Sequence, residues 1–190
     1  MSTLVDTLLD RASHAANTLA APAPDQHQIK RIVGSALTAP DHGKLRPWRF
    51  VVISEEARHQ LGNALAIAAA QADPSLSSDK QDMIKAKALR APMIIACLVE
   101  ITEELEKVPP FEQILSAGAA IQQMQLAAND LGFGCCWLSG PYSNTAPVKE
   151  FLNAAEKELI AGFVYIGTPS QPAPKKPRPA LADHLVFMND

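Results

Sequence analysis

The chain has 190 residues, of which 47% are hydrophobic and 19% are charged, and its formal net charge is −3. These proportions are typical of one globular domain with a packed core and exclude a disordered chain. The charge gives no electrostatic footprint for nucleic acid, and no apolar run approaches the roughly 18 residues of a membrane span. We therefore expect a single domain over residues 1–190 that binds neither nucleic acid nor a membrane.

The cysteines and histidines favour a protein of a reducing compartment. Three cysteines, two of them adjacent at 135 and 136, do not form a disulfide framework, and the five histidines lack the spacing of zinc ligands. The first residues show neither the basic region nor the apolar core of a signal peptide. We therefore expect a cytoplasmic protein without a bound metal, in which Cys135 and Cys136 act as small core hydrophobes.

The first third of the chain predicts two helices, a loop and a strand. Apolar periodicity indicates a helix over 4–16, and a proline-rich linker follows over 19–24. Asp25 and Gln28 have the spacing of a capping box, which predicts the start of a second helix. An extended loop over 38–50 ends that helix, because each of its two prolines biases the preceding residue away from helix.

The remaining patterns predict elements of both kinds. A β-branched run indicates a buried strand over 50–53, and a continuous apolar run indicates another over 93–99. The other expected elements are, in order, a helix over 55–70 capped by Ser54, a basic helix over 79–89, a long helix over 111–131 stopped by Gly132, a strand and turn over 134–141, a helix over 147–159, a strand over 160–167 and an extended tail over 171–190.

The loop over 38–50 has an unusual composition. It concentrates one Asp, one His, one Lys, two Arg and one Trp. Cations around an indole, held on a rigid loop, suit a planar, anionic ligand. The alternative is a solvated connection in which Trp48 covers the core.

Four segments resemble motifs of the FMN-dependent nitroreductase family, in the order that the family has them. Ala39-Pro40-Asp41-His42, followed by Pro47-Trp48-x-Phe50, resembles that family's Ala-Pro-Ser-x-x-Asn-x-Gln-Pro-Trp-x-Phe loop, and looks closest to its short, single-domain branch. The other three are Arg11-x-Ser13, Gly134–Gly140 and Gly167–Arg178. The resemblance thus covers about the whole chain.

This resemblance implies a fold and an assembly. The expected fold is α+β, a sheet wrapped by helices, and the expected homodimer forms through long central helices that include residues 111–131. Two flavins lie at the interface of such a dimer, and the loop over 38–50 reaches the flavin held mainly by the other subunit.

The resemblance also implies the residues that bind the cofactor. Cations suit the FMN phosphate, because Arg meets phosphate through two parallel hydrogen bonds. A positive wall suits reduced flavin, which is anionic near N1 and the C2 oxygen. Ala15 lacks the cation of the family motif, and Lys44 and Arg46 replace its usual Asn and Gln. The implied cofactor-binding residues are Arg11, Ala12, Ser13, Thr38, Asp41, His42, Lys44, Arg46, Trp137, Leu138, Ser139, Gly140, Lys176 and Arg178.

The implied activity is that of an FMN-dependent NAD(P)H oxidoreductase. NAD(P)H gives hydride to flavin N5, leaves, and is replaced by a nitroaromatic, quinone or similar acceptor in a ping-pong sequence. No side chain is assigned a catalytic role, because the cofactor carries this chemistry. Two alternatives remain: another flavin oxidoreductase activity on the same scaffold, such as substrate dehydrogenation or alkene reduction, and a non-catalytic flavin-binding dimer.

Overall fold

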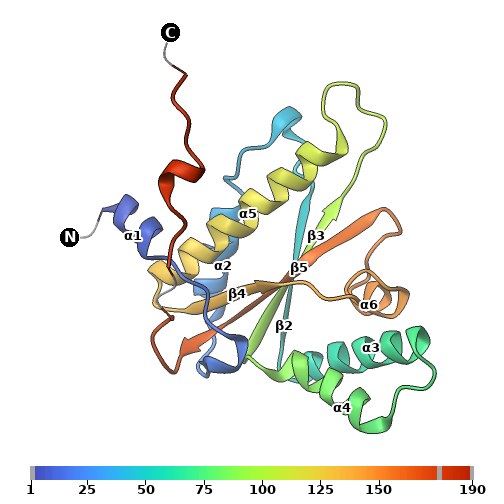
Figure 1. Ribbon diagram of the computed structural model, residues 1–190. Helices are drawn as coiled ribbons and strands as arrows, with labels where there is room; N and C mark the ends of the chain where they lie inside the picture. The colour runs from blue at the N-terminus through green and yellow to red at the C-terminus, as the bar shows by residue number, and fades with distance from the viewer. Residues whose placement is uncertain (1–2, 175–176, 189–190) are drawn as a thin grey trace.

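An antiparallel sheet lies at the centre of the computed structural model, which describes residues 3–174 and 177–188 (Figure 1). Within these residues the strand order is β1-β5-β3-β2, and β4 pairs with β5 beside β1. The predicted α+β class is therefore confirmed. The strands are β1 Leu19–Ala20, β2 Trp48–Ser54, β3 Met93–Glu100, β4 Gly134–Leu138 and β5 Glu158–Pro169.

Helices cover both faces of the sheet (Figure 1). They are α1 Leu4–Asp10, α2 Gln26–Ala36, α3 Glu56–Ala72, α4 Ser78–Ala86, α5 Pro110–Asp130 and α6 Ala146–Phe151, with 3₁₀ turns η1 Ala16–Thr18, η2 His42–Lys44, η3 Lys87–Leu89 and η4 Leu181–Asp183. None of the helices in the described residues combines the length and apolarity that a membrane span requires.

The core has two halves because side chains alternate along each strand. Ile94, Ala96 and Leu98 of β3 pack with α3 and α6, whereas Met93, Ile95 and Cys97 pack with α2 and α5. The buried run of β3 is thus explained by helices on both of its faces, as predicted for the interior of a sheet.

Local capping rules correctly predicted where α2 begins and where α5 ends. The side chain of Asp25 accepts from the Gln28 N–H at 2.8 Å, and the Gln28 side chain accepts from the Asp25 N–H at 2.9 Å. Gly132 adopts φ 85° directly after the C-cap of α5, which is the left-handed conformation that glycine tolerates best.

Several predicted elements differ from the structure. The tail predicted to be extended over 171–190 contains the 3₁₀ turn η4, and the predicted linker over 19–24 begins with β1, which pairs with β5. The first helix ends at Asp10 rather than residue 16, because the His14 N–H is drawn to the Cys135 carbonyl oxygen at 3.1 Å. The strand over 48–54 lies at the edge of the sheet, so only Ile53 is fully buried. Ser54 ends that strand and does not cap α3, whose N-cap is Glu55. The expected helix over 147–159 ends at Phe151, and β5 begins within it at Glu158.

A β-bulge shapes the middle of β5. The register with β3 shifts between Cys97 and Leu98, which leaves Ala161 without a partner on β3. Its free carbonyl oxygen accepts the Trp137 Nε1–H at 3.1 Å. The next residue, Gly162, has φ 143°, and a Cβ there would overlap the indole nitrogen and lie 2.8 Å from the Leu138 carbonyl oxygen. The bulge and the glycine together allow Trp137 to lie across β5.

A buried carboxylate ties the edge strand β2 to β5. Arg49 donates from Nε and Nη2 to the two Glu158 oxygens, each at 2.8 Å, and the Ala155 N–H donates to Glu158 Oε2 at 2.8 Å. The Glu158 side chain is 7% exposed. The hydrogen bond from Arg49 is the main cause that lowers the pKa of Glu158, against the opposing effect of burial.

Replacement of this carboxylate should destabilise the fold in a pH-dependent way. We expect Glu158→Gln to lower the free energy of unfolding by about 1–2 kcal/mol at about pH 7, because it removes a charge-assisted pair whose arginine is partly exposed to solvent. A carboxyl group whose pKa is lower in the folded state stabilises the fold at pH values above its pKa in the unfolded state. This contribution to stability is lost as the pH falls through the folded-state pKa.

Chemical denaturation at several pH values measures this effect. The difference between wild type and Glu158→Gln should shrink as the pH falls below the carboxyl range. Glu150→Gln, which changes an exposed carboxylate on α6, is the matched control and should leave stability unchanged. A difference that stays constant down to about pH 3 would contradict the assignment.

Candidate functional site

Two segments from opposite ends of the chain form a basic cluster beside β4. Arg11 follows α1, and its Nη1 donates to Ser13 Oγ at 3.4 Å. Arg178 Nη2 donates to the carbonyl oxygens of Arg11 at 2.6 Å and Leu9 at 3.2 Å. The structure thus brings together three residues that the sequence predicted, and we call Arg11, Ser13 and Arg178 the basic cluster.

The cations of the basic cluster lack a counterion. Neither Arg11 nor Arg178 forms an ion pair with a carboxylate among residues 3–174 and 177–188. Arg178 instead uses one nitrogen to hold the backbone that carries Arg11. Two guanidinium groups and a hydroxyl that face no carboxylate form a donor set suited to a phosphate.

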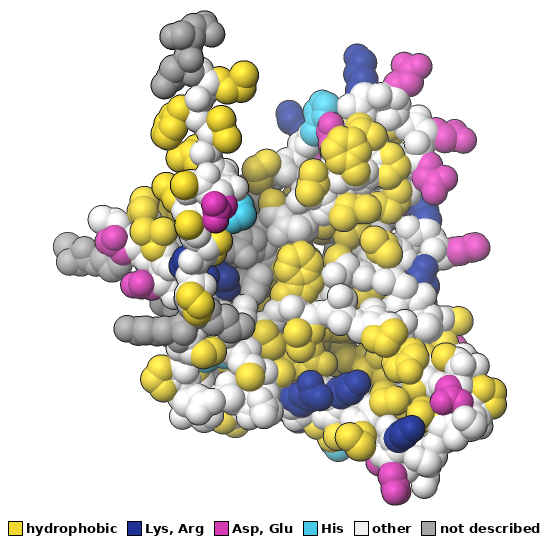
Figure 2. All heavy atoms as spheres, viewed as in Figure 1, with side chains coloured by type: hydrophobic (Ala, Val, Ile, Leu, Met, Phe, Trp, Pro, Cys, Tyr) yellow, Lys and Arg dark blue, Asp and Glu magenta, His cyan; other side chains and the backbone are white. Residues whose placement is uncertain are grey.

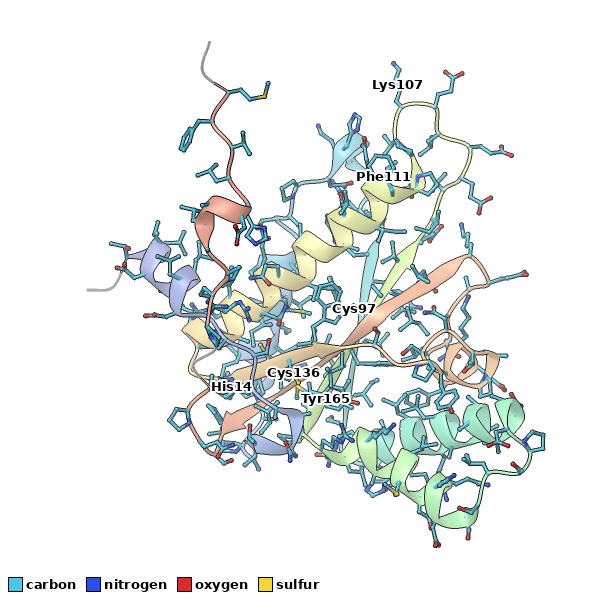
Figure 3. All side chains as sticks on the ribbon, viewed as in Figure 1. His14, Cys97, Lys107, Phe111, Cys136 and Tyr165 are labelled. Atoms are coloured by element: carbon cyan, nitrogen blue, oxygen red, sulfur yellow. The ribbon has the colours of Figure 1, made fainter. Side chains whose placement is uncertain are left out.

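A cavity lies between Ser13 of the basic cluster and the end of β4. It has a volume of about 460 Å³, and Ser13, Ala15 and Pro174 form one wall while Cys136, Trp137 and Leu138 form another. We call it the α1-side cavity. It places two predicted motifs, the Arg11-x-Ser13 segment and the Gly134–Gly140 segment, on the two walls of one site. Figure 3 shows His14, Cys136 and Tyr165 close together in this region.

The end of β4 is held in a defined conformation. Trp137 and Leu138 are 41% and 40% exposed, although they extend a buried strand. The hydrogen bond to Ala161 fixes the indole, and the Gly140 N–H donates to Ser143 Oγ at 2.9 Å. Two large side chains that are rigid and exposed at a cavity are suited to contact a flat, apolar ligand.

A second cavity continues beyond Leu138. Its volume is about 340 Å³, and its walls include Leu138, Ser139 and Gly140 on one side and Lys87 and Arg90 on the other. Tyr142, Phe163 and Tyr165 also line it. We call it the α4-side cavity. It shares only Leu138 and Arg90 with the α1-side cavity among their lining residues in the described chain.

The predicted residues of the loop over 38–50 lie elsewhere in the protomer. Figure 1 shows η2 near the N-terminal end of α5, whereas α1 and β4 lie near the opposite end. Thr38 Oγ1 donates to Gln123 Oε1 at 3.0 Å, and His42 Nδ1 lies 2.7 Å from Glu112 Oε2; both partners belong to α5. Within one chain the structure therefore does not bring Thr38, Asp41, His42, Lys44 and Arg46 to the basic cluster.

The backbone of this loop is nevertheless strained and specific. Lys44 and Arg46 adopt φ 55° and φ 51°, which non-glycine residues rarely do. The Arg46 N–H is held by Asp41 Oδ2 at 2.7 Å, which stabilises the turn. Such strain persists where surrounding contacts fix the chain, often at ligand sites. The predicted loop is present, but it contains the 3₁₀ turn η2 and is not extended throughout; its rigidity and its ligand contacts stay predictions.

Two further predictions have different outcomes. Lys176 lies outside the described residues. Ala12 follows Arg11 in the extended segment after α1 and is half-buried, so any ligand contact there would involve its backbone or methyl group.

Lys87 and Arg90 are the site residues that the sequence reasoning missed. Both belong to the segment between α4 and β3 and line the α4-side cavity. Figure 2 shows basic side chains between α1 and the C-terminal segment and near the end of α4, besides others at the upper right of this view. The only signal in the sequence was the basic character of residues 79–89, which resembles any solvated helix.

Burial disfavours the charged forms of the titratable groups on and beside β4. Burial raises the pKa of the Cys135 thiol to about 12 and that of the Cys136 thiol to about 11. Burial also lowers the pKa of His14, whose Nδ1 is buried without a hydrogen-bond partner among the described residues. The reading of both cysteines as core hydrophobes agrees with these protonated thiols.

Comparisons with known proteins agree with this geometry. The model of the Nitroreductase family matches residues 8–168. The chain is 39% identical over 168 residues to a protein of Escherichia coli strain K12 named "Putative NAD(P)H nitroreductase YdjA". This alignment covers 87% of each of the two chains.

Solved structures show the same fold. A nitroreductase-like family protein from Bacillus cereus superposes with a TM-score of 0.84 at 19% identity, covering 99% of this chain and 97% of that one. The FMN- and NADPH-dependent nitroreductase NfnB from a Sphingopyxis strain superposes with a TM-score of 0.78 at 17% identity, covering 99% and 100%. The extent of the family match and the identity to YdjA establish the relationship: this chain belongs to the nitroreductase family.

Proposed function

We propose that the protein is an FMN-dependent NAD(P)H oxidoreductase that acts as a homodimer on a nitroaromatic, quinone or similar acceptor. The observation that carries the proposal is the basic cluster of Arg11, Ser13 and Arg178, whose Ser13 lines a cavity that the end of β4 borders on the other side. An anionic group and a flat, apolar group, joined in one ligand, match these two ends. FMN has this composition.

The donor set fits the two parts of FMN separately. Arg11, Ser13 and Arg178 offer N–H and O–H donors without a protein acceptor of opposite charge, as a phosphate requires. Trp137 to Gly140 offer an exposed apolar surface and backbone at the ring end. The relatives' names support the same cofactor and an NAD(P)H donor.

The residues bind and orient, and bound FMN supplies the transfer of hydride from NAD(P)H to the acceptor in two half-reactions. Trp137, fixed by the Ala161 carbonyl and by the absence of a Cβ at Gly162, holds the end of β4 in place. Leu138 forms part of the wall of both cavities and offers them an apolar side chain. One acceptor replacing the oxidised nicotinamide in the same space gives ping-pong kinetics.

The purified protein provides the direct test of this function. We expect a yellow protein whose cofactor, released by denaturation and identified by mass, is FMN, and which oxidises NADH or NADPH when a nitroaromatic or quinone is present. Parallel lines in double-reciprocal plots would support the ping-pong sequence. A colourless protein that does not take up FMN would refute the proposal, and an FMN-binding protein without turnover would reduce it to a flavin-binding dimer.

Exposed apolar surface supports the dimer. Leu4 and Leu9 of α1 are 72% and 68% exposed, and no residue of α1 is buried. Phe111 and Leu115 of α5 are 60% and 65% exposed, and Phe187 in the C-terminal segment is 76% exposed. Monomeric proteins rarely leave so many large apolar side chains uncovered. In a symmetric dimer the loop over 38–50, at the other end of α5, comes to the partner's cavities.

A charge placed on α5 should therefore disrupt the assembly. We expect Leu115→Glu to raise the dimer dissociation constant by at least about a hundredfold, because it removes a leucine that the proposed interface buries at two symmetric positions and introduces unpaired carboxylates. Sedimentation or light scattering over a concentration series measures the change. Ile67→Glu on α3, where Ile67 is 52% exposed, is the control, and an equal effect of the two substitutions would place the interface elsewhere.

Arg11 should bind the phosphate. We expect Arg11→Ala to weaken FMN binding by roughly ten- to a hundredfold, because a charge-assisted contact contributes on the order of 1.5–3 kcal/mol. Riboflavin lacks the phosphate and should lose far less. Titration of both ligands into the wild-type and mutant apoproteins gives the comparison, and equal losses for the two would show that Arg11 does not contact the phosphate.

A further inference from the structure

The α1-side and α4-side cavities meet at two residues, Leu138 and Arg90. Leu138 ends β4, and Arg90 follows η3 directly before β3. Ser13 of the basic cluster lines the α1-side cavity, and Ser139 and Gly140 line the α4-side cavity, so a ligand that occupies both passes this junction. Arg90 therefore borders both cavities, whereas Arg11 and Arg178 line neither.

Arg90 is poised to meet a ligand rather than another protein group. Its side chain is exposed, and it forms no hydrogen bond or ion pair with any part of the chain that the structure describes. Arg90 lines the α1-side cavity together with Cys136 and the α4-side cavity together with Tyr165. Cys136 and Tyr165 are directly paired on β4 and β5, so Arg90 approaches the strand pair that forms the floor of the site.

Other cations are less well placed. Lys87, one turn earlier, lines only the α4-side cavity. Lys44 and Arg46 line neither cavity in this protomer. Ala15 contributes a methyl group to the α1-side cavity, so Arg90 is the only arginine or lysine among the described residues that line it.

We propose that Arg90 is a cofactor-contacting residue that faces the ring of FMN and stabilises the negative charge that the ring gains on reduction. This inference rests on the proposed binding of FMN. A fixed cation beside a group that becomes anionic favours the charged form, because the charge is stabilised in a partly desolvated site. Arg90 thus raises the reduction potential of the bound cofactor, while Arg11 and Arg178 serve the phosphate in both redox states.

The two roles are separable by ligand and by redox state. Arg90→Ala should weaken FMN and riboflavin by the same factor, because both carry the ring, in contrast to Arg11→Ala. It should also weaken the reduced form about tenfold more than the oxidised form, which corresponds to a midpoint potential lower by about 30 mV for a two-electron couple. Arg90→Lys keeps the charge and should retain most of the wild-type potential.

The measurements are titrations of the apoproteins with FMN and riboflavin, and spectroscopic potentiometry of the FMN-loaded proteins. Lys85→Ala is the matched control, because Lys85 lies close in sequence, pairs with Asp82 at 2.8 Å and lines neither cavity. An unchanged potential in Arg90→Ala, or a shift no larger than in Lys85→Ala, would overturn the inference. A much greater loss of FMN than of riboflavin would assign Arg90 to the phosphate instead and overturn it too. Failure of wild-type protein to bind FMN would refute the proposed function itself, so the two failures are distinguishable.

Discussion

The pairing of β5 with three other strands holds the candidate site together. One edge of β5 pairs with β3 along most of its length, while the other edge pairs first with β4 and then with β1. The segment after α1 and the end of β4 are far apart in sequence, yet both are aligned against this one strand. The bulge at Ala161 then turns a ladder carbonyl toward Trp137. Without this strand the two walls of the α1-side cavity have no common support.

Local physical rules explain what the sequence could predict. The capping box at Asp25, the glycine after α5 and the apolar run of β3 depend on neighbouring residues, and each agrees with the structure. The same holds for the class of the fold and for the meeting of Arg11, Ser13 and Arg178, which the family resemblance implied. Ser54 failed as a cap because residues 48–54 are recruited into β2 by pairing with β3, a contact between segments far apart in the chain.

The rest of the site depends on tertiary packing that no local pattern encodes. Arg90 reaches the two cavities because β3 pairs with β5, and β5 pairs with β4. In the sequence it only closes a basic segment. The loop over 38–50 shows the reverse case, since its composition pointed to a site, yet a single protomer keeps it at the other end of α5. In the homodimer proposed above, this loop would reach the site of the second chain, and the sequence of one protomer does not show how two chains are placed.

The link between Arg178 and the carbonyl of Arg11 joins residues 167 positions apart. Contacts of such separation form late in folding, because a long loop must close before they stabilise anything. During synthesis the amino-terminal segment leaves the ribosome long before residue 178 is made. β5 ends at Pro169, shortly before Arg178, so the sheet and the basic cluster are both completed only at the end of synthesis. Chains cut short just after β5 would keep strands β1 to β5 but lose Arg178, which holds the backbone that carries Arg11.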